Sequence, residues 1–261
     1  ELQGNNGGMT YSKNTATITV TVSDNLNGGY TASVNTENDI FTNQYSTNLD
    51  YSAKGGLSIV KKLNGHNMEA FQFLVKPADQ ASADKAGIQM SGQTYQNASG
   101  ASMDQQGTST EQISVLENMK FTQADAGKTY TYTITEQPGN GAGYRYDDTE
   151  YTVNIVTADD GKGVLTVTTE IKGSNGVSES YVYTNVKDSA ANRAAVTFTN
   201  DYSASGELGG KGDVSISAEK ILTGRSMKNG EFTFSVTDKN GKEVSRGTNQ
   251  AAAEAQAGAV D

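Results

Sequence analysis

Hydrophobic and polar residues alternate in short segments along much of the chain. From Thr129 to Thr135, threonine alternates with tyrosine or isoleucine, which puts the larger side chains on one face of a half-buried strand. The stretch from Asp159 to Gly163 lies between two alternating runs and predicts a hairpin turn. We therefore predict an all-β fold, a two-sheet sandwich with strands near 57–63, 70–75, 112–116, 129–136, 150–157, 163–171, 180–184 and 195–202.

Segments without this alternation are interpreted as connections. Residues 80–110 are polar and rich in Ala, Ser, Gly and Gln, which predicts a long loop with at most a short helix. The segments from Ser46 to Gly56 and from Ser203 to Gly212 are polar and contain glycine. We expect both to be short linkers between domains.

The chain contains an internal repeat. The motif Phe-Thr-Asn-Gln-Tyr-Ser at 41–46 returns as Phe-Thr-Asn-Asp-Tyr-Ser at 198–203, and Lys61, like Lys220, is followed four residues later by glycine. One unit is therefore about 158 residues long. We predict that the chain holds the C-terminal part of a preceding sandwich repeat at 1–48, a complete domain at 49–207 and the N-terminal part of the following repeat at 208–261.

Composition and net charge disfavour several classes of function. The 30 acidic and 20 basic residues give a net charge of −10, which disfavours nucleic acid and anionic membranes, and no apolar run is long enough for membrane insertion. Cysteine is absent, which excludes disulfides, thiolate metal sites and a cysteine nucleophile, and the single histidine, His66, leaves little room for a histidine-based triad or a multi-histidine metal site. We expect no cofactor and no metal site, and an enzyme acting on external substrates is disfavoured.

Strand parity places three polar side chains in the interior. Successive side chains of a strand point to opposite faces, so Lys61 shares the apolar face with Ile59 and Leu63. By the same alternation Glu136 shares a face with Ile134, and Asn200 shares one with Phe198. A lysine, an acid and a carboxamide are therefore expected to meet in the core.

Burial gives such a set a specific chemistry. Desolvation favours the neutral amine of a lysine and the protonated form of a glutamic acid, which could polarise the amide oxygen and then move protons. We expect Lys61 to attack the side-chain amide of Asn200 with loss of ammonia, assisted by Glu136. The product is an isopeptide cross-link that forms once and does not turn over.

The motifs that carry these residues resemble the streptococcal pilin isopeptide-linkage domain of the FctA backbone-pilin type. They are Lys before Leu-x-Gly, then Phe-x-Phe, then Tyr-Thr-Tyr-Thr-Ile-Thr-Glu and finally Phe-Thr-Asn-x-Tyr. The resemblance implies immunoglobulin-like β-sandwich repeats of a Gram-positive pilin or adhesin stalk. It also implies that a first-strand Lys bonds a last-strand Asn with help from a middle-strand Glu, the roles of Lys61, Asn200 and Glu136.

On this interpretation the protein is a structural module of the extracellular, cell-wall-attached surface, with any signal peptide and anchor outside this sequence. Its expected partners are neighbouring repeats of the same polypeptide. The alternative is an adhesin domain that binds a host glycan or matrix protein directly, through the 80–110 segment. A polymerisation motif at Tyr11-Ser12-Lys13-Asn14 is disfavoured, because repeat alignment places it at the approach to an ordinary strand.

The partial repeats carry parts of the same site. Glu1 and Asn43 occupy the Glu and Asn positions of the first unit, whose Lys is missing, and Lys220 is the Lys of the third unit. We expect that neither partial unit links internally, while head-to-tail association between chains is conceivable.

Overall fold

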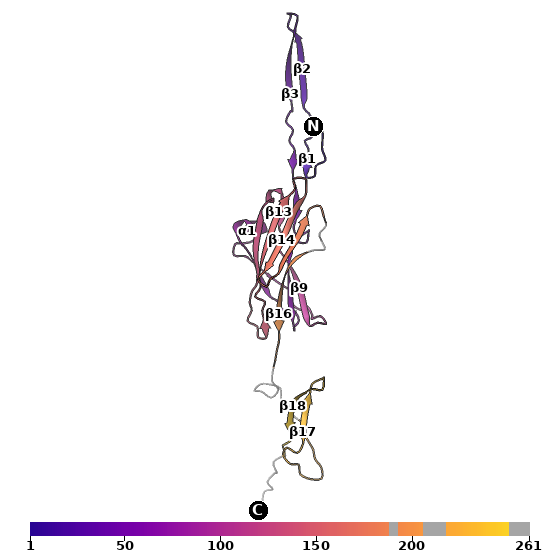
Figure 1. The fold of residues 1–261 in the computed structure, drawn as a ribbon, viewed down its shortest axis with the longest axis vertical. Coiled ribbons are helices and arrows are strands. Elements are labelled where there is room, and N and C mark those ends of the chain that lie inside the picture. Colours follow the sequence, from indigo (N-terminus) through magenta and orange to yellow (C-terminus); the bar gives the residue numbers. More distant parts are fainter. Residues whose placement is uncertain (188–192, 206–217, 251–261) are drawn as a thin grey trace, which may run out of the picture. The chain divides into compact units, whose positions relative to one another are not determined.

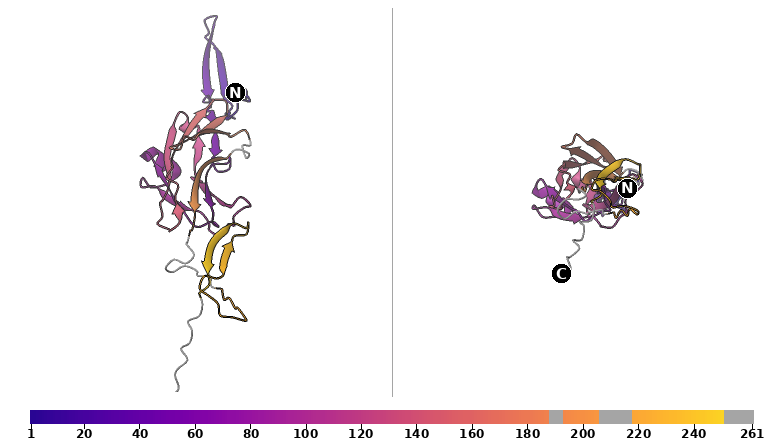
Figure 2. Two further views of the ribbon diagram at one scale, coloured as in Figure 1. Left: turned by 60° about the horizontal axis from the view of Figure 1, so that its bottom comes forward. Right: turned by 90° about the horizontal axis from the view of Figure 1, so that it is seen from below.

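The computed structural model describes residues 1–187, 193–205 and 218–250. The chain divides into two compact units, at 1–204 and 205–261, three residues from the boundary expected between the second and third repeats. Strands are the main regular structure of the described residues, which also contain one short helix and one 3-10 turn, so the all-β prediction is confirmed. Figures 1 and 2 show the strands of the first unit packed in layers.

Two sheets form the sandwich of the first unit. The larger sheet has the order β15-β14-β13-β11-β7-β8 and the smaller has the order β12-β16-β6-β9. The larger sheet comprises β7 (Gln72–Pro77), β8 (Gln93–Gln96), β11 (Thr129–Glu136), β13 (Glu150–Asp159), β14 (Leu165–Gly173) and β15 (Ser178–Thr184). The smaller comprises β6 (Leu57–Asn64), β9 (Thr108–Val115), β12 (Tyr144–Arg145) and β16 (Ala194–Tyr202).

Alternation explains why these segments form strands and which face they bury. Along β6, β11, β13 and β16 every second residue is buried, and the inward side chains of the two sheets make one apolar core. Strands β6 and β16 are adjacent and parallel, with Lys61 opposite Phe198 and Leu63 opposite Asn200. The first and last strands of the sandwich therefore lie side by side, although they are far apart in the sequence.

The predicted linker at 46–56 is wrong, because this segment belongs to the sandwich. Its residues Asn48–Asp50 form β5, which pairs with β10 (Lys120–Thr122). The side chains of Leu49 and Tyr51 are buried in the core, and the Tyr51 hydroxyl shares a 2.7 Å hydrogen bond with that of Thr169. The strand pairing that orders the segment is made with residues about 70 positions away, so local composition gave no sign of it.

The 80–110 segment is more ordered than a loop. It contains the predicted short helix, α1 (Gln80–Ala86), capped by the Asp79 side chain and by Gly87. It also contains β8 and the first residues of β9, which sequence reasoning missed. The second predicted linker, at 203–212, lies mostly outside the described residues.

Residues 1–46 form a smaller assembly at one end of the sandwich. Strands β2 (Thr17–Asp24) and β3 (Tyr30–Glu37) make an antiparallel hairpin, and β1 (Met9–Thr10) pairs with β4 (Gln44–Tyr45). The Tyr45 hydroxyl donates to Asp159 Oδ1 at 2.6 Å, which holds this assembly against the β13–β14 turn. In the second unit, β17 (Thr233–Thr237) and β18 (Glu243–Thr248) form a further antiparallel pair.

Candidate functional site

The structure brings the three predicted side chains together in the core of the sandwich. Lys61 projects from β6 and Asn200 from the adjacent strand β16, both in the smaller sheet. Glu136 is the last residue of β11 in the opposite sheet. Lys61 and Asn200 have no exposed surface and Glu136 is 6% exposed, so the site lies between the two sheets and is closed to bulk water.

One carboxylate joins the amine and the carboxamide. The Lys61 ammonium donates to Glu136 Oε2 at 2.6 Å, and Asn200 Nδ2 donates to Glu136 Oε1 at 2.6 Å. Each oxygen of Glu136 thus has its own donor from a different strand. The arrangement holds the amine and the amide against the same carboxylate, and such positioning of the reacting groups is what an amide exchange requires.

Burial controls the protonation of the pair. Burial lowers the pKa of Lys61, although the contact with Glu136 acts to raise it. Burial also raises the pKa of Glu136, although the contact with Lys61 acts to lower it. Both shifts favour moving the proton from the amine to the acid. The site can therefore present a neutral amine, which is a nucleophile, beside a protonated carboxyl.

A fourth residue, Asp147, contacts the site and was missed by sequence reasoning. Its backbone N–H donates to Asn200 Oδ1 at 2.8 Å, while its side chain accepts from the backbone N–H groups of Thr149 and Thr199. The amide oxygen is thus polarised by this backbone group. The expectation that Glu136 would polarise that oxygen is corrected, since Glu136 contacts the amide nitrogen instead. The contact to Asn200 is made by a backbone N–H, so no side-chain pattern in the sequence could have indicated it.

Aromatic rings cover the amine. Lys61 Nζ lies 4.5 Å from the centre of the Phe71 ring, and Phe71 packs edge-on against Tyr144 and Tyr146. The rings exclude water from the reacting groups and strengthen the desolvation that shifts both pKa values.

The residues predicted for the partial repeats are placed separately. Asn43 Nδ2 donates to Glu1 Oε1 at 2.8 Å in the first unit, where both residues are exposed. Lys220 belongs to the second unit, is exposed, and lies 4.8 Å from the centre of the Phe232 ring. The structure therefore pairs Glu1 with Asn43 and places Lys220 with an aromatic residue of its own unit.

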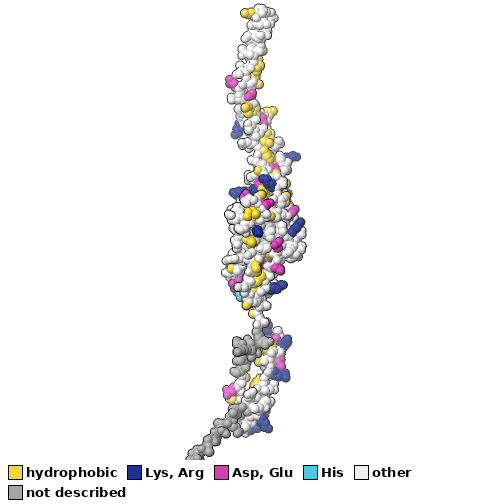
Figure 3. Space-filling model, turned by 90° about the vertical axis from the view of Figure 1, so that its left-hand side faces the viewer, with side chains coloured by type: hydrophobic (Ala, Val, Ile, Leu, Met, Phe, Trp, Pro, Cys, Tyr) yellow, Lys and Arg dark blue, Asp and Glu magenta, His cyan; other side chains and the backbone are white. Residues whose placement is uncertain are grey.

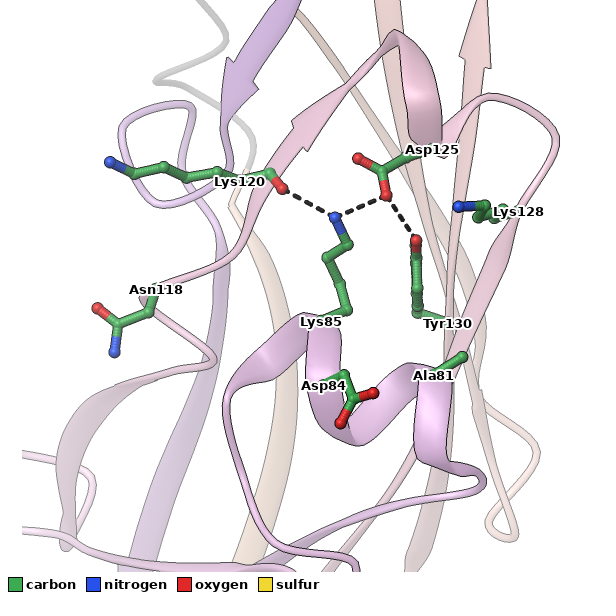
Figure 4. A pocket seen from close by; sticks show the side chains of 8 residues that line it. All are labelled: Ala81, Asp84, Lys85, Asn118, Lys120, Asp125, Lys128 and Tyr130. Carbon is green, nitrogen blue, oxygen red and sulfur yellow. Dashed lines mark hydrogen bonds and ion pairs between the residues drawn. The ribbon is translucent and has the colours of Figure 1, made fainter.

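A second lysine–carboxylate pair, between the half-buried Lys85 and the buried Asp125, lies at a surface pocket of about 540 Å³ beside α1. Figure 4 shows Lys85 Nζ between Asp125 Oδ1, at 2.6 Å, and the Lys120 carbonyl oxygen, at 3.1 Å. Burial would raise the pKa of Asp125, but hydrogen bonds from Lys85 and Tyr130 outweigh it and lower that pKa. The Asp125 carboxylate is therefore ionised, and its ion pair with Lys85 holds α1 against the 120–125 segment. It differs in this from the Lys61–Glu136 pair, where burial favours the neutral amine and the protonated acid.

Within the described ranges there is no cluster of three or more His, Asp or Glu side chains arranged to hold a metal ion. In the same residues, no helix has the length and apolar character needed to cross a bilayer.

Comparison with known proteins identifies the family. The model of the Spy0128-like isopeptide containing domain (FctA) matches residues 1–46 and 57–203. These ranges make up more than half of the chain, so the chain belongs to this family of isopeptide-containing pilin domains. No curated protein sequence matches the chain.

Similar solved structures include two pilins. The major pilin protein (T-13) from Streptococcus pyogenes is 19% identical, with a TM-score of 0.30 over 56% of this chain and 51% of that one. A mutant of the major pilin from Streptococcus pyogenes is 14% identical, with a TM-score of 0.30 over 56% of this chain and 50% of that one. The chain spans about half the length of each of these structures.

Proposed function

We propose that the complete unit is a structural module of a Gram-positive surface pilus or stalk, and that it closes itself with an isopeptide bond between Lys61 and Asn200. The observation that carries this proposal is the Glu136 carboxylate, which binds the amine through one oxygen and the amide nitrogen through the other in a closed apolar core. Family membership supports the structural role.

The reaction follows from these contacts. Lys61 transfers a proton to Glu136, and the neutral amine attacks Cγ of Asn200 while the Asp147 N–H stabilises the charge that develops on Oδ1. Glu136 then delivers its proton to Nδ2, which it already contacts, and accepts a second proton from the attacking nitrogen. The Cγ–Nδ2 bond breaks, ammonia leaves, and Glu136 remains protonated beside the new amide.

The position of the bond suits a domain that bears tension along the chain. Because β6 and β16 are parallel neighbours, a pull applied before the first strand and after the last one shears them past each other. A covalent link between Lys61 and Asn200 carries that force directly and leaves the strands between them unloaded. It also resists reductants, so the chain needs no disulfide, in keeping with its lack of cysteine.

Intact-mass measurement tests the proposal. The wild-type chain should weigh about 17 Da less than its sequence for each bond, the mass of one ammonia. Lys61→Ala, Glu136→Ala and Asn200→Ala should each restore the mass lost in the complete unit. Lys62→Ala is the matched control, because Lys62 is the exposed neighbour on the other face of the same strand. A full-mass wild-type protein refutes the proposal.

A further inference from the structure

The loop at 137–146 connects two parts of the candidate site. It begins after Glu136, the acid, and it ends before Asp147, whose backbone N–H donates to the reacting amide oxygen at 2.8 Å. The start of the loop is fixed to the larger sheet, because the N–H of Gln137 donates to the carbonyl of Gln72 at 2.7 Å. A shift in the rest of the loop would therefore displace the N–H donor relative to the acid.

The side chain of Tyr146 lies inside this loop. The N–H of Gly141 donates to its hydroxyl oxygen at 3.2 Å, and Gly139 passes so close to the hydroxyl that a methyl group there would overlap with it. The backbone of Gly139 does not have the positive φ that favours glycine, so the close approach is what requires glycine here. The loop is thus wrapped around the tyrosine. We call Gly139, Gly141 and Tyr146 the tyrosine clamp.

The ring of Tyr146 also supports the cover of the amine. Its centre lies 6.1 Å from that of Phe71, at an interplanar angle of 74°, and the Phe71 ring lies over Lys61 Nζ. Both rings line a surface groove of about 350 Å³. Hydrophobic side chains, tyrosine included, are visible on the surface of the sandwich in Figure 3. Tyr146 and Phe71 therefore stand between this groove and the amine.

Residues 1–46 contain the same kind of clamp. There the N–H of Asn6 donates to the Tyr11 hydroxyl at 3.4 Å, and a methyl group on Gly4 would overlap with that hydroxyl. Tyr11 follows Glu1 by ten residues, which is also the spacing from the acid to the tyrosine in the complete unit. The two loops therefore wrap a tyrosine in the same way.

The clamp occurs with the same contacts to an amide in both places. The N–H of Ser12, the residue after the tyrosine, donates to Asn43 Oδ1 at 2.7 Å. Asn43 Nδ2 donates to Glu1 Oε1 at 2.8 Å. The corresponding distances in the core site are 2.8 and 2.6 Å. The acid, the amide and the N–H donor thus have one arrangement wherever the loop is wrapped around its tyrosine.

Burial does not explain this agreement. Asn43 is exposed, whereas Asn200 has no exposed surface. Most of the loop sequence does not explain it either, because residues 2–10 and 137–145 are identical at only three of nine positions. The wrapped tyrosine is a feature that both sites have, so we assign the shared geometry to it.

We propose that Tyr146 is a positioning residue for the isopeptide reaction and that it acts through the loop wrapped around it. It holds the acid and the N–H donor at the distances from Asn200 that the reaction needs, and it keeps the aromatic cover over the amine. It takes no part in the bond changes themselves. The inference rests on the reaction proposed for Lys61 and Asn200.

The rate of ammonia loss after refolding, followed by intact mass, tests this role. Tyr146→Phe keeps the ring but removes the acceptor of the Gly141 N–H, and it should slow the loss about 10-fold. Tyr181→Phe is the matched control, because Tyr181 is a half-buried tyrosine of β15 whose hydroxyl donates to Glu179. This control should react at the wild-type rate.

A steric variant tests the wrapping itself. Gly139→Ala places a methyl group against the Tyr146 hydroxyl, so it should also slow the reaction. Tyr146→Ala removes the group that this methyl meets. Gly139→Ala should therefore slow the loss in the wild-type chain but have no further effect in the Tyr146→Ala chain. Independent, additive effects of the two substitutions would overturn the proposal.

Hydrogen exchange separates positioning from overall stability. It is measured in the Glu136→Gln chain, which retains Asn200 but lacks the proton carrier. Adding Tyr146→Phe should raise the exchange rate of the Asp147 amide about 10-fold, while the amides of β14 stay protected. An equal rise across β14 would assign the effect to a loss of stability and overturn the inference.

The outcomes distinguish the positioning role from the proposed function. A Tyr146→Phe chain that loses ammonia at the wild-type rate would overturn the positioning role and leave the proposed function intact. A wild-type chain that never loses ammonia would overturn the proposed function, and the positioning role in the reaction with it.

Discussion

Replacing Asn200 with alanine separates the covalent link from the rest of the buried site. The substitution removes the electrophile, so no bond can form. Lys61 still donates to Glu136 at 2.6 Å, so neither charge is left without its partner. Compared with the linked protein, from which Nδ2 has left as ammonia, the variant therefore loses the cross-link, the hydrogen bond from the Asp147 N–H to Asn200 Oδ1 and little else.

The size of the effect follows from the length of the closed loop. A link between Lys61 and Asn200 encloses about 140 residues, for which the chain-entropy relation used for disulfides gives about 5 kcal/mol of stabilisation. The hydrogen bond from the Asp147 N–H to Asn200 Oδ1 adds about 1 kcal/mol. For a domain of this size, each kcal/mol corresponds to about 2–4 °C. We therefore expect Asn200→Ala to lower the Tm of the sandwich by about 10–25 °C.

Calorimetry of samples whose mass has been checked is the assay. Glu136→Gln serves as a second unlinked variant that retains Asn200, and Lys62→Ala serves as a linked control with an unchanged Tm. Comparing wild type with Glu136→Gln isolates the cross-link from the contacts of Asn200. A wild-type protein that has lost the mass of one ammonia, and so carries the cross-link, but melts within about 3 °C of both unlinked variants would refute the loop-closure argument.

Three further predictions concern the reaction itself. Glu136→Gln should keep the fold, because an amide oxygen still accepts from Lys61, but show no mass loss after days, since the proton carrier is gone. Burial lowers the pKa of Lys61 and raises that of Glu136, which favours the reactive neutral pair. The neutral pair and the ion pair hold the same number of protons, so their ratio does not depend on pH. The rate of ammonia loss after refolding, followed by mass, should be flat near neutral pH. It should fall in acid, where the amine stays charged, and in alkali, where Glu136 has no proton to give. Asp147→Ala should slow the loss by about 10- to 100-fold because the side chain positions the N–H on Asn200, and Asp147→Asn, which keeps one of the two acceptor oxygens, should restore part of the rate. Equal rates in both variants and wild type would contradict that role.

The sequence by itself determined the long strands of the sandwich and the direction of their side chains. A two-residue period is a local property, so the inward position of Lys61, Glu136 and Asn200 could be read directly and agrees with their burial. The same rule placed Lys62 outside. The internal repeat likewise located Glu1, Asn43 and Lys220 without any coordinates.

Only the tertiary structure decided which groups touch. The β5 strand at 48–50 is ordered by its pairing with β10, and the N–H of Asp147 reaches Asn200 because β12, which precedes it, pairs with β16. The assignment of Glu136 to the amide nitrogen depends on how two sheets face each other across the core. Such contacts join residues 50 or more positions apart, and their geometry is set by sheet packing, which no local pattern of side chains encodes.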